Sequence, residues 1–264
     1  MGSHDERINA YYSEGNEATR LTEQSVGGVL ELRAARRSFS LIKPASCVLD
    51  IGGATGVHAA WLAEQGHEVT LVDPVASQVE IAKAHSTFTA LVGDARELPF
   101  DKETFDVAIM FGPLYHLADS RDRLIALSEA KRVLRPGGLI FVAALSRLSA
   151  FSNSVLESGG QSITAGDVEV LRTGDWVNDG PGFPGGHFHT AAELRHELEN
   201  SGFSNISIRS LDFPSLVFES LKPRQELIDS ADFLLQNLEE TFAGLPIAET
   251  LANLSPHILG IGQK

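Results

Sequence analysis

The sequence has little cysteine and little positive charge. Cys47 is the single cysteine among 264 residues, so an internal disulfide is excluded and nothing points to an oxidising compartment. Lysine and arginine total 21 against 35 aspartate and glutamate residues, a formal net charge of −14. A chain this acidic repels nucleic acid and anionic lipid surfaces. We therefore expect a small-molecule substrate and neither nucleic acid nor membrane as a partner.

Long hydrophobic runs are missing as well. No apolar stretch reaches the roughly 20 residues of a membrane span, and the start of the chain lacks the charged and apolar regions of a signal peptide. These absences predict a cytoplasmic protein. The length fits one large domain with an insert. The sequence leaves the oligomeric state open, with a homodimer as one candidate.

Short apolar runs alternate with helical segments in the middle of the chain. This alternation is typical of a doubly wound α/β fold, whose mostly parallel sheet is covered on both faces. Helices are predicted over 57–65, 75–84 and 121–134, the last stopped at Pro136. Strands are predicted over 47–51, 69–72, 89–92, 105–111 and 139–145.

The segments on either side follow other patterns. Residues 1–43 are predicted as an N-terminal helical cap, helical from residue 5 onward, on a catalytic domain of residues 44–264. Thr190 and Glu193 form a capping-box pattern at the start of a helix ending at Ser201. Further predictions are strands at 206–208 and 257–261, a helix over 222–253, and lid inserts at about 146–189, rich in Ser, Gly, Asn and Pro, and at 212–254.

A glycine-rich loop, Gly52-Gly53-Ala54-Thr55-Gly56, follows the first strand and opens the first helix. Glycine lets the backbone turn sharply and approach a ligand, and ligands of open α/β sheets bind beyond the carboxyl ends of the strands. The alternative is a tight turn without a ligand. Asp73, at the end of the next strand, suits the two hydroxyls of a ribose, although it also suits a helix N-terminus.

The third strand end carries groups that fit an adenine, and the fourth strand ends at Phe111-Gly112-Pro113 against the same crevice. In Gly93-Asp94-Ala95, the carboxylate can accept from an exocyclic amine while a backbone N–H donates to a ring nitrogen. The alternative is an ordinary strand-end turn. A nicotinamide site is disfavoured, because the G-x-G-x-x-G spacing counted from Gly52 meets Ala54 and Val57. The pattern favours a nucleoside without phosphate.

These segments together resemble the class I S-adenosylmethionine-dependent methyltransferases. The resemblance covers about residues 45–145 and is nearest to the methyltransferase type 11, ubiquinone/menaquinone-methyltransferase-like branch. It implies a Rossmann-like seven-stranded sheet with an antiparallel last strand, with helical cover inserts and S-adenosyl-L-methionine as cofactor. Ala54 departs from the glycine usual in the family. The segments that carry the resemblance are 50–56, Asp73, 93–95, Phe105-Asp106-Val107 and 134–138.

The resemblance also implies which residues hold the cofactor. The glycines of the loop would approach the methionyl tail, Asp73 the ribose, and Asp94 the adenine amino group. Arg20 would pair with the cofactor carboxylate. The expected set is Asp50, Gly52, Gly53, Ala54, Gly56, Asp73, Pro74, Gly93, Asp94, Ala95, Phe111, Gly112 and Arg20.

His116 follows the fourth strand and is the first candidate for a catalytic base, because histidine titrates near neutrality. The alternative is a histidine that packs under the cofactor. Tyr115 is a second catalytic candidate or a structural residue. The N-terminal segment resembles one that folds over the cofactor in small-molecule members of the family. Tyr11 or Tyr12 would then form a hydrogen-bonded pair with His116, unless the segment is an ordinary amphipathic helix.

His187 and His189 suggest a metal site, but no cysteine or clustered carboxylate completes it in the sequence, so we predict no metal. Three aromatic residues in or beside the glycine-rich part of the first insert suit stacking on a flat acceptor, or packing as core. They are Trp176, Phe183 and Phe188.

The sequence therefore predicts a methyltransferase of secondary metabolism acting on a small aromatic or heterocyclic acceptor. A narrower hypothesis is indole C3 of a tryptophan-containing cyclodipeptide, giving a pyrroloindoline. One alternative is a protein that binds S-adenosylmethionine or S-adenosylhomocysteine without catalysis. Another is an O- or N-methyltransferase of a quinone-like or phenolic metabolite. A nicotinamide oxidoreductase is a third alternative.

Overall fold

The structure is a computed structural model of the 264-residue chain. It describes residues 4–13, 21, 26–157, 163–177, 183–213, 225–242, 245 and 247–264.

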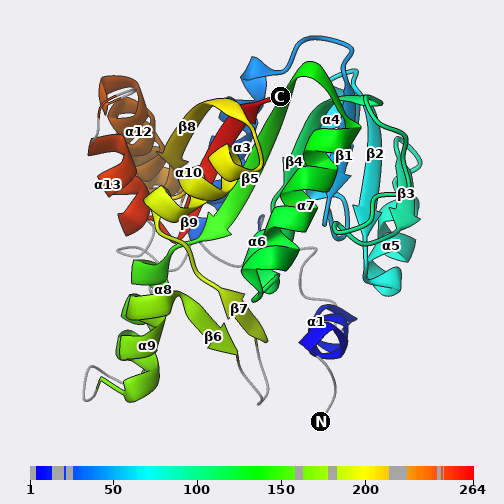
Figure 1. Ribbon diagram of the computed structural model, residues 1–264. Coiled ribbons are helices and arrows are strands. Elements are labelled where there is room, and N and C mark those ends of the chain that lie inside the picture. The colour runs from blue at the N-terminus through cyan, green and yellow to red at the C-terminus, as the bar shows by residue number, and fades with distance from the viewer. Residues whose placement is uncertain are drawn as a thin grey trace.

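A seven-stranded sheet forms the centre of the molecule, in the order β3-β2-β1-β4-β5-β9-β8 (Figure 1). The first five strands along the chain pair in parallel, and β9 pairs antiparallel with both β5 and β8. The predicted fold, including the antiparallel last strand, is confirmed. The strands are β1 Cys47–Ile51, β2 Glu68–Asp73, β3 Thr89–Val92, β4 Phe105–Met110, β5 Leu134–Leu145, β8 Ser204–Ser210 and β9 His257–Gln263.

Helices cover both faces of this sheet. Successive strand residues point to opposite faces, so the buried residues of one strand serve two cores. Leu49 joins the core under α7 and α10, whereas Val48 joins the core under α3, α4 and α5. The covering helices are α3 Val26–Ser38, α4 Val57–Glu64, α5 Ala76–Lys83, α7 Ser120–Val133 and α10 Ala191–Asn200.

The predicted N-terminal helix is divided. α1 (His4–Ser13) lies at the lower edge of the domain in Figure 1, apart from α3, which runs into a short 3-10 helix, η2 (Phe39–Leu41). β5 also begins earlier than predicted, because α7 continues directly into the strand at Leu134.

The first predicted insert has more regular structure than its composition suggested. It contains helices α8 (Arg147–Glu157) and α9 (Ala165–Thr173) and a small antiparallel sheet of β6 (Asp175–Val177) and β7 (Gly185–His187). These elements project from the same edge of the main sheet as α1 (Figure 1). A capping box at the start of α9 shows how this polar sequence nucleates a helix.

The second predicted insert lies elsewhere. Its described helices are α12 (Gln225–Phe242) and α13 (Ile247–Leu254). α12 packs against α3, and α13 packs against β8. Figure 1 shows both at the opposite end of the sheet from α1, so the described part of this insert covers the sheet rather than the edge below it.

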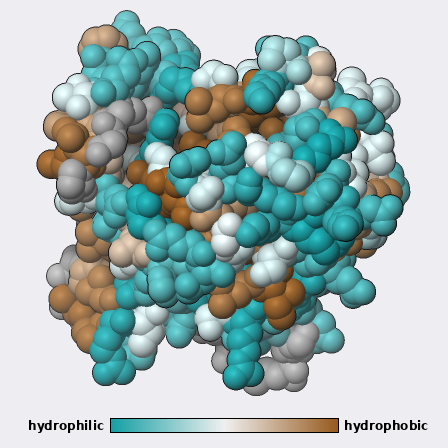
Figure 2. Space-filling view, turned by 45° about the horizontal axis from the view of Figure 1, so that its top comes forward, coloured by the Kyte–Doolittle hydropathy of each residue, from teal (hydrophilic) through white to brown (hydrophobic). Residues whose placement is uncertain are grey.

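The face shown in Figure 2 is mostly hydrophilic, with hydrophobic residues gathered in separate patches. Among the described helices, none combines the length and apolar character needed to cross a membrane.

Candidate functional site

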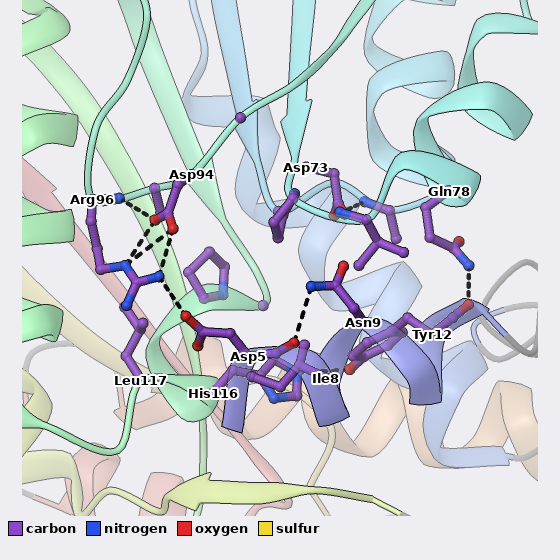
Figure 3. Close-up of a pocket in the computed structure, with 18 of the residues that line it drawn as sticks. Asp5, Ile8, Asn9, Tyr12, Asp73, Gln78, Asp94, Arg96, His116 and Leu117 are labelled. Carbon is purple, nitrogen blue, oxygen red and sulfur yellow. Dashed lines mark hydrogen bonds and ion pairs between the residues drawn. The ribbon is translucent and has the colours of Figure 1, made fainter. Parts of the chain in front are cut away.

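A cavity of about 220 Å³ opens at the carboxyl ends of β1, β2 and β4. Strand-end residues and the short helix α6 (Pro113–His116) form its walls. The helix α1 forms its floor and contributes Asp5, Ile8, Asn9 and Tyr12 (Figure 3). The N-terminal segment therefore lies across the edge where the sequence predicted the ligand.

The glycine loop is folded for close approach. Gly52 has a φ of +71°, and a Cβ there would lie 2.7 Å from Cδ of Pro113. Only glycine allows α6 to pack this tightly on the loop. Ala54 also adopts a left-handed conformation, with a φ of +47°, which is unfavourable for a residue with a side chain.

Asp73 is held by the loop that it faces. Its Oδ2 accepts a hydrogen bond from the backbone N–H of Ala54 at 2.9 Å, and its Oδ1 accepts from that of Val75 at 2.8 Å. These two bonds orient the carboxylate in the wall of the main cavity.

Asp94 lies across the cavity from Asp73 (Figure 3). Its carboxylate accepts hydrogen bonds from the Arg96 guanidinium, the shortest at 2.6 Å. Although burial opposes ionisation, these bonds hold the pKa of Asp94 below its usual value. Arg96 also pairs with Asp5 of α1 at 3.0 Å and with Asp122 of α7 at 2.9 Å. One cation thus links the floor helix, the predicted adenine site and α7.

A second, smaller cavity adjoins the first, since Gly52, Ala54 and Phe111 line both. We call it the tail cavity. Its lining also includes Asp50, whose pKa is raised to about 7 by burial and by the charge of Asp73. The buried Oδ2 of Asp50 has no hydrogen-bond partner among the described residues. A buried acceptor of this kind fits a donor group of a bound ligand.

His116 and Tyr12 meet at the edge of the main cavity. The Tyr12 hydroxyl lies 2.8 Å from Nε2 of His116. Burial lowers the pKa of His116 to about 3, so its imidazole is neutral at physiological pH. A neutral imidazole can accept the proton of the Tyr12 hydroxyl, which in turn can accept a proton from a ligand.

The other two tyrosines have different surroundings. The Tyr115 hydroxyl donates to the carbonyl oxygen of Phe111 at 3.0 Å, which fixes the turn that carries His116. Tyr11 packs edge to face on Tyr12, with ring centroids 5.0 Å apart, and on Phe183 at 6.1 Å. Neither tyrosine hydroxyl therefore has the geometry of the Tyr12–His116 pair.

The β6–β7 hairpin brings further aromatic rings to this pair. The ring of Phe183 lies 5.4 Å from that of His116 and is nearly parallel to Trp176 at 6.4 Å. Phe188 lies 6.4 Å from Phe183. The backbone of the hairpin also lies close to the turn that carries His116. A Cβ added at Gly186 would lie only 2.0 Å from the carbonyl oxygen of Tyr115.

His187 and His189 do have a carboxylate beside them, so that part of the sequence argument was wrong. Ligand atoms of the two histidines and Glu197 lie within 4.8 Å of one another. Glu197 accepts hydrogen bonds from His189 at 3.1 Å and from Arg123 at 2.8 Å. Although burial opposes it, these partners lower the pKa of Glu197 to about 2. The Arg123 cation disfavours a metal ion here, and the contacts describe a hydrogen-bonded network instead.

The structure brings most of the predicted cofactor residues to the two cavities. Gly56 is an exception: it lines neither, and its φ of +87° and a Cβ clash with Phe88 at 2.5 Å explain why glycine stands there. Arg20 lies outside the described residues. Lining residues that the sequence argument missed are Asp5, Ile8, Asn9, Val75, Gln78, Arg96, Pro113 and Leu117 in the main cavity, and Leu21, Glu31, Thr55, Val57 and His58 in the tail cavity.

The fold is an α/β sheet with a cavity at the carboxyl ends of its strands, and part of the chain matches a known family. Residues 49–142 match the family model described as methyltransferase domain. This part of the chain is therefore similar to methyltransferase domains.

Individual proteins extend the comparison. An uncharacterized methyltransferase of Mycobacterium tuberculosis is 35% identical over 133 residues, which cover 50% of this chain and 49% of that protein. The demethylmenaquinone methyltransferase of Staphylococcus aureus is 30% identical over 158 residues, covering 54% and 60%. The chain thus spans about half the length of the curated relatives it matches first.

A solved structure matches nearly the whole chain. The 1,6-didemethyltoxoflavin-N1-methyltransferase of Burkholderia thailandensis has a TM-score of 0.57 and 17% identity, covering 99% of this chain and 86% of that one. It was solved with 1,6-didemethyltoxoflavin and S-adenosylhomocysteine bound. At this identity the likeness shows the fold.

Proposed function

We propose that the protein transfers the methyl group of S-adenosylmethionine to a small, flat aromatic or heterocyclic acceptor of secondary metabolism. The observation that carries the proposal is the Tyr12–His116 pair, which stands at the edge of the nucleoside-sized cavity and beside the aromatic hairpin. In this proposal Asp73 binds the ribose hydroxyls, Asp94 binds the adenine amino group, and the glycine loop receives the methionyl tail.

The bound cofactor supplies an electrophilic methyl group, and its carbon–sulfur bond breaks as the acceptor attacks. The chain's own contribution is orientation and proton removal. The Tyr12 oxygen accepts the proton of an acceptor N–H or O–H while its own proton passes to Nε2 of His116. Because burial lowers the pKa of His116 to about 3, its imidazole is a weak base, so His116 relays the proton onward rather than storing it.

Aromatic residues around the pair favour a flat acceptor. The ring of Phe183 lies beside His116, and the rings of Tyr11 and Trp176 lie beside Phe183. Stacked rings lie about 3.5–4 Å apart, so an acceptor cannot fit between His116 and Phe183 at a centroid separation of 5.4 Å. The acceptor therefore takes the place of Phe183 against the pair, and the phenyl ring moves to the outer face of the acceptor.

The narrower form of the proposal is methylation of indole C3 in a tryptophan-containing cyclodipeptide. C3 forms the new bond to the methyl carbon while the indole N–H proton passes to Tyr12 and His116. The neighbouring amide nitrogen then adds to C2, and its proton moves to the indole nitrogen to complete the pyrroloindoline. An O- or N-methylated phenolic or quinone-like acceptor would use the same proton path.

The test measures methyl transfer to a panel of tryptophan cyclodipeptides, phenols and heterocyclic amines. We expect His116→Ala and Tyr12→Phe to lower turnover by about 10²-fold, the usual contribution of acid–base catalysis, with nearly unchanged cofactor binding in calorimetry. His196→Ala, on the exposed face of α10, is the matched control and should keep full turnover. Unchanged turnover in both site variants would refute the base role.

The alternative is a protein that binds the cofactor without catalysis. It predicts saturable binding of S-adenosylmethionine or S-adenosylhomocysteine and no methylated product with any member of the panel. The absence of binding to either would refute both functions.

A further inference from the structure

Glu31 is a carboxylate buried within an otherwise mostly apolar helix face. It is 2% exposed and lies on α3 between Leu30 and Leu32, which are also buried. Burying a carboxylate costs several kcal/mol unless partners compensate it, and the proposed function gives Glu31 no role.

The position of Glu31 suggests a role. Its side chain lines the tail cavity together with the backbone of the glycine loop and Asp50. None of the described residues lining this cavity is a lysine or arginine. The electrostatic character of the cavity is therefore acidic, which favours a cation in it.

His257 and Asp212 lie next to Glu31. Its Oε2 lies 3.6 Å from Nδ1 of His257, and this Nδ1 lies 2.8 Å from Oδ2 of Asp212. The other oxygen of Asp212 accepts from the Ser255 hydroxyl at 2.6 Å and from the backbone N–H of His257 at 2.9 Å. Asp212 thus has three hydrogen-bond partners in this chain, so its contacts describe a hydrogen-bonded cluster rather than a metal site.

We propose that Glu31 binds the α-ammonium group of the cofactor's amino-acid tail, and that His257 and Asp212 position its carboxylate. This inference rests on the proposed function, because it requires the adenosine part of the cofactor to occupy the adjoining main cavity. The two cavities meet at Gly52, Ala54 and Phe111, as a ligand spanning both requires.

Asp50 is the competing acid in the same cavity. A Cβ on Gly53 would lie 2.7 Å from the Asp50 carboxyl, so this group sits directly beneath the loop backbone. Burial and the charge of Asp73 raise the pKa of Asp50 to about 7, so a large part of this group is protonated at neutral pH. A protonated carboxyl is a poor partner for an ammonium group, and Glu31 is therefore the better one.

The experiment combines two variants with two ligands. Calorimetry measures the Kd of S-adenosylhomocysteine and of its analogue with hydrogen in place of the α-amino group. We expect Glu31→Gln to weaken S-adenosylhomocysteine by about tenfold or more, the usual value of a hydrogen bond to a charged group. The same variant should change the Kd of the deamino analogue by less than about twofold. Glu199→Gln, an exposed change of equal charge on α10, should alter neither Kd.

Three further outcomes decide the assignment. Glu31→Asp, which keeps the charge but shortens its reach, should give an intermediate and equally selective loss. Equal weakening of both ligands by Glu31→Gln, or no weakening, would overturn the proposal. A selective loss in Asp50→Asn alone would assign the ammonium group to Asp50 and also overturn it. If the wild-type protein binds neither ligand nor 5′-methylthioadenosine, the proposed function itself fails.

Discussion

Single residues set the geometry of the site, and Ala54 is the residue of the glycine loop that stands where the resemblance implies glycine. Its φ of +47° places a side chain in the left-handed region, where glycine would be relaxed. Its N–H nevertheless donates to Asp73, so the loop keeps the strained conformation because that hydrogen bond needs it. The strain is thus local, and glycine should relieve it.

We predict that Ala54→Gly raises the free energy of unfolding by about 0.5–1 kcal/mol. The same change should leave the affinity for S-adenosylmethionine equal or slightly higher, since the methyl group no longer faces the cavity. Urea denaturation and calorimetry measure the two effects. Thr55→Gly in the same loop is the control and should be destabilising. A loss of stability in Ala54→Gly would show that the left-handed conformation carries no strain.

The strand-end residues of the site could be predicted from the sequence, but the residues that other elements bring to it could not. Asp73 and Asp94 follow apolar runs, so their location at one sheet edge is predictable from strand periodicity. Arg96 was missed because its partners, Asp5 and Asp122, are distant in sequence. Glu31 was missed because a charge within a helical pattern is normally assigned to the exposed face.

At the scale of elements, capping boxes occur both at a helix of the main sheet and at a helix of the first insert. Thr190 and Glu193 cap α10, which packs on the main sheet, and Thr164 and Asp167 cap α9 in the first insert. The chemistry of the two caps is the same. Their contribution to global stability should differ, because α10 contributes to the main core through Leu194 and Leu198 whereas α9 does not.

We predict that Thr190→Ala lowers the global free energy of unfolding by about 1 kcal/mol, the usual value of a lost cap. Thr164→Ala should instead speed hydrogen exchange in α9, with a smaller global effect. Denaturant unfolding and hydrogen-exchange mass spectrometry measure these two quantities. Equal global losses in both variants would mean that the insert unfolds together with the domain.

Element types and the sheet were predictable where apolar periodicity was strong. The five parallel strands and the cap at Thr190 match the predictions. The helices and hairpin of residues 146–189 were not foreseen, since local capping and tertiary contacts overcome a composition rich in Ser and Gly. The location of α12 and α13 depends on contacts with α3 and β8, which no local pattern reveals.

At the scale of the whole molecule, buried histidines make stability depend on pH. Burial, with a contribution from the nearby His189, lowers the pKa of His187 to about 4, although Asp175 opposes the shift. The unfolded chain binds this proton near pH 6.5 and the folded protein only near 4. Between these values the unfolded state therefore holds more protons, so stability falls as the pH decreases.

We predict that the free energy of unfolding decreases from pH 7 to pH 4.5, and that His187→Asn makes this decrease shallower. Urea titrations at four pH values give both curves, and His85→Asn, an exposed histidine, is the control. If His187→Asn and the wild type show the same slope, His187 titrates alike in the folded and unfolded states.

The close backbone contact at Gly186 limits how the protein can be altered. Any larger residue at this point would push the hairpin and the turn that carries His116 apart. Engineering for a new acceptor should therefore randomise Trp176 and Phe183, whose rings can change without moving the main chain. A library that spares Gly186 should yield active clones, whereas one that includes it should lose them together with the reaction.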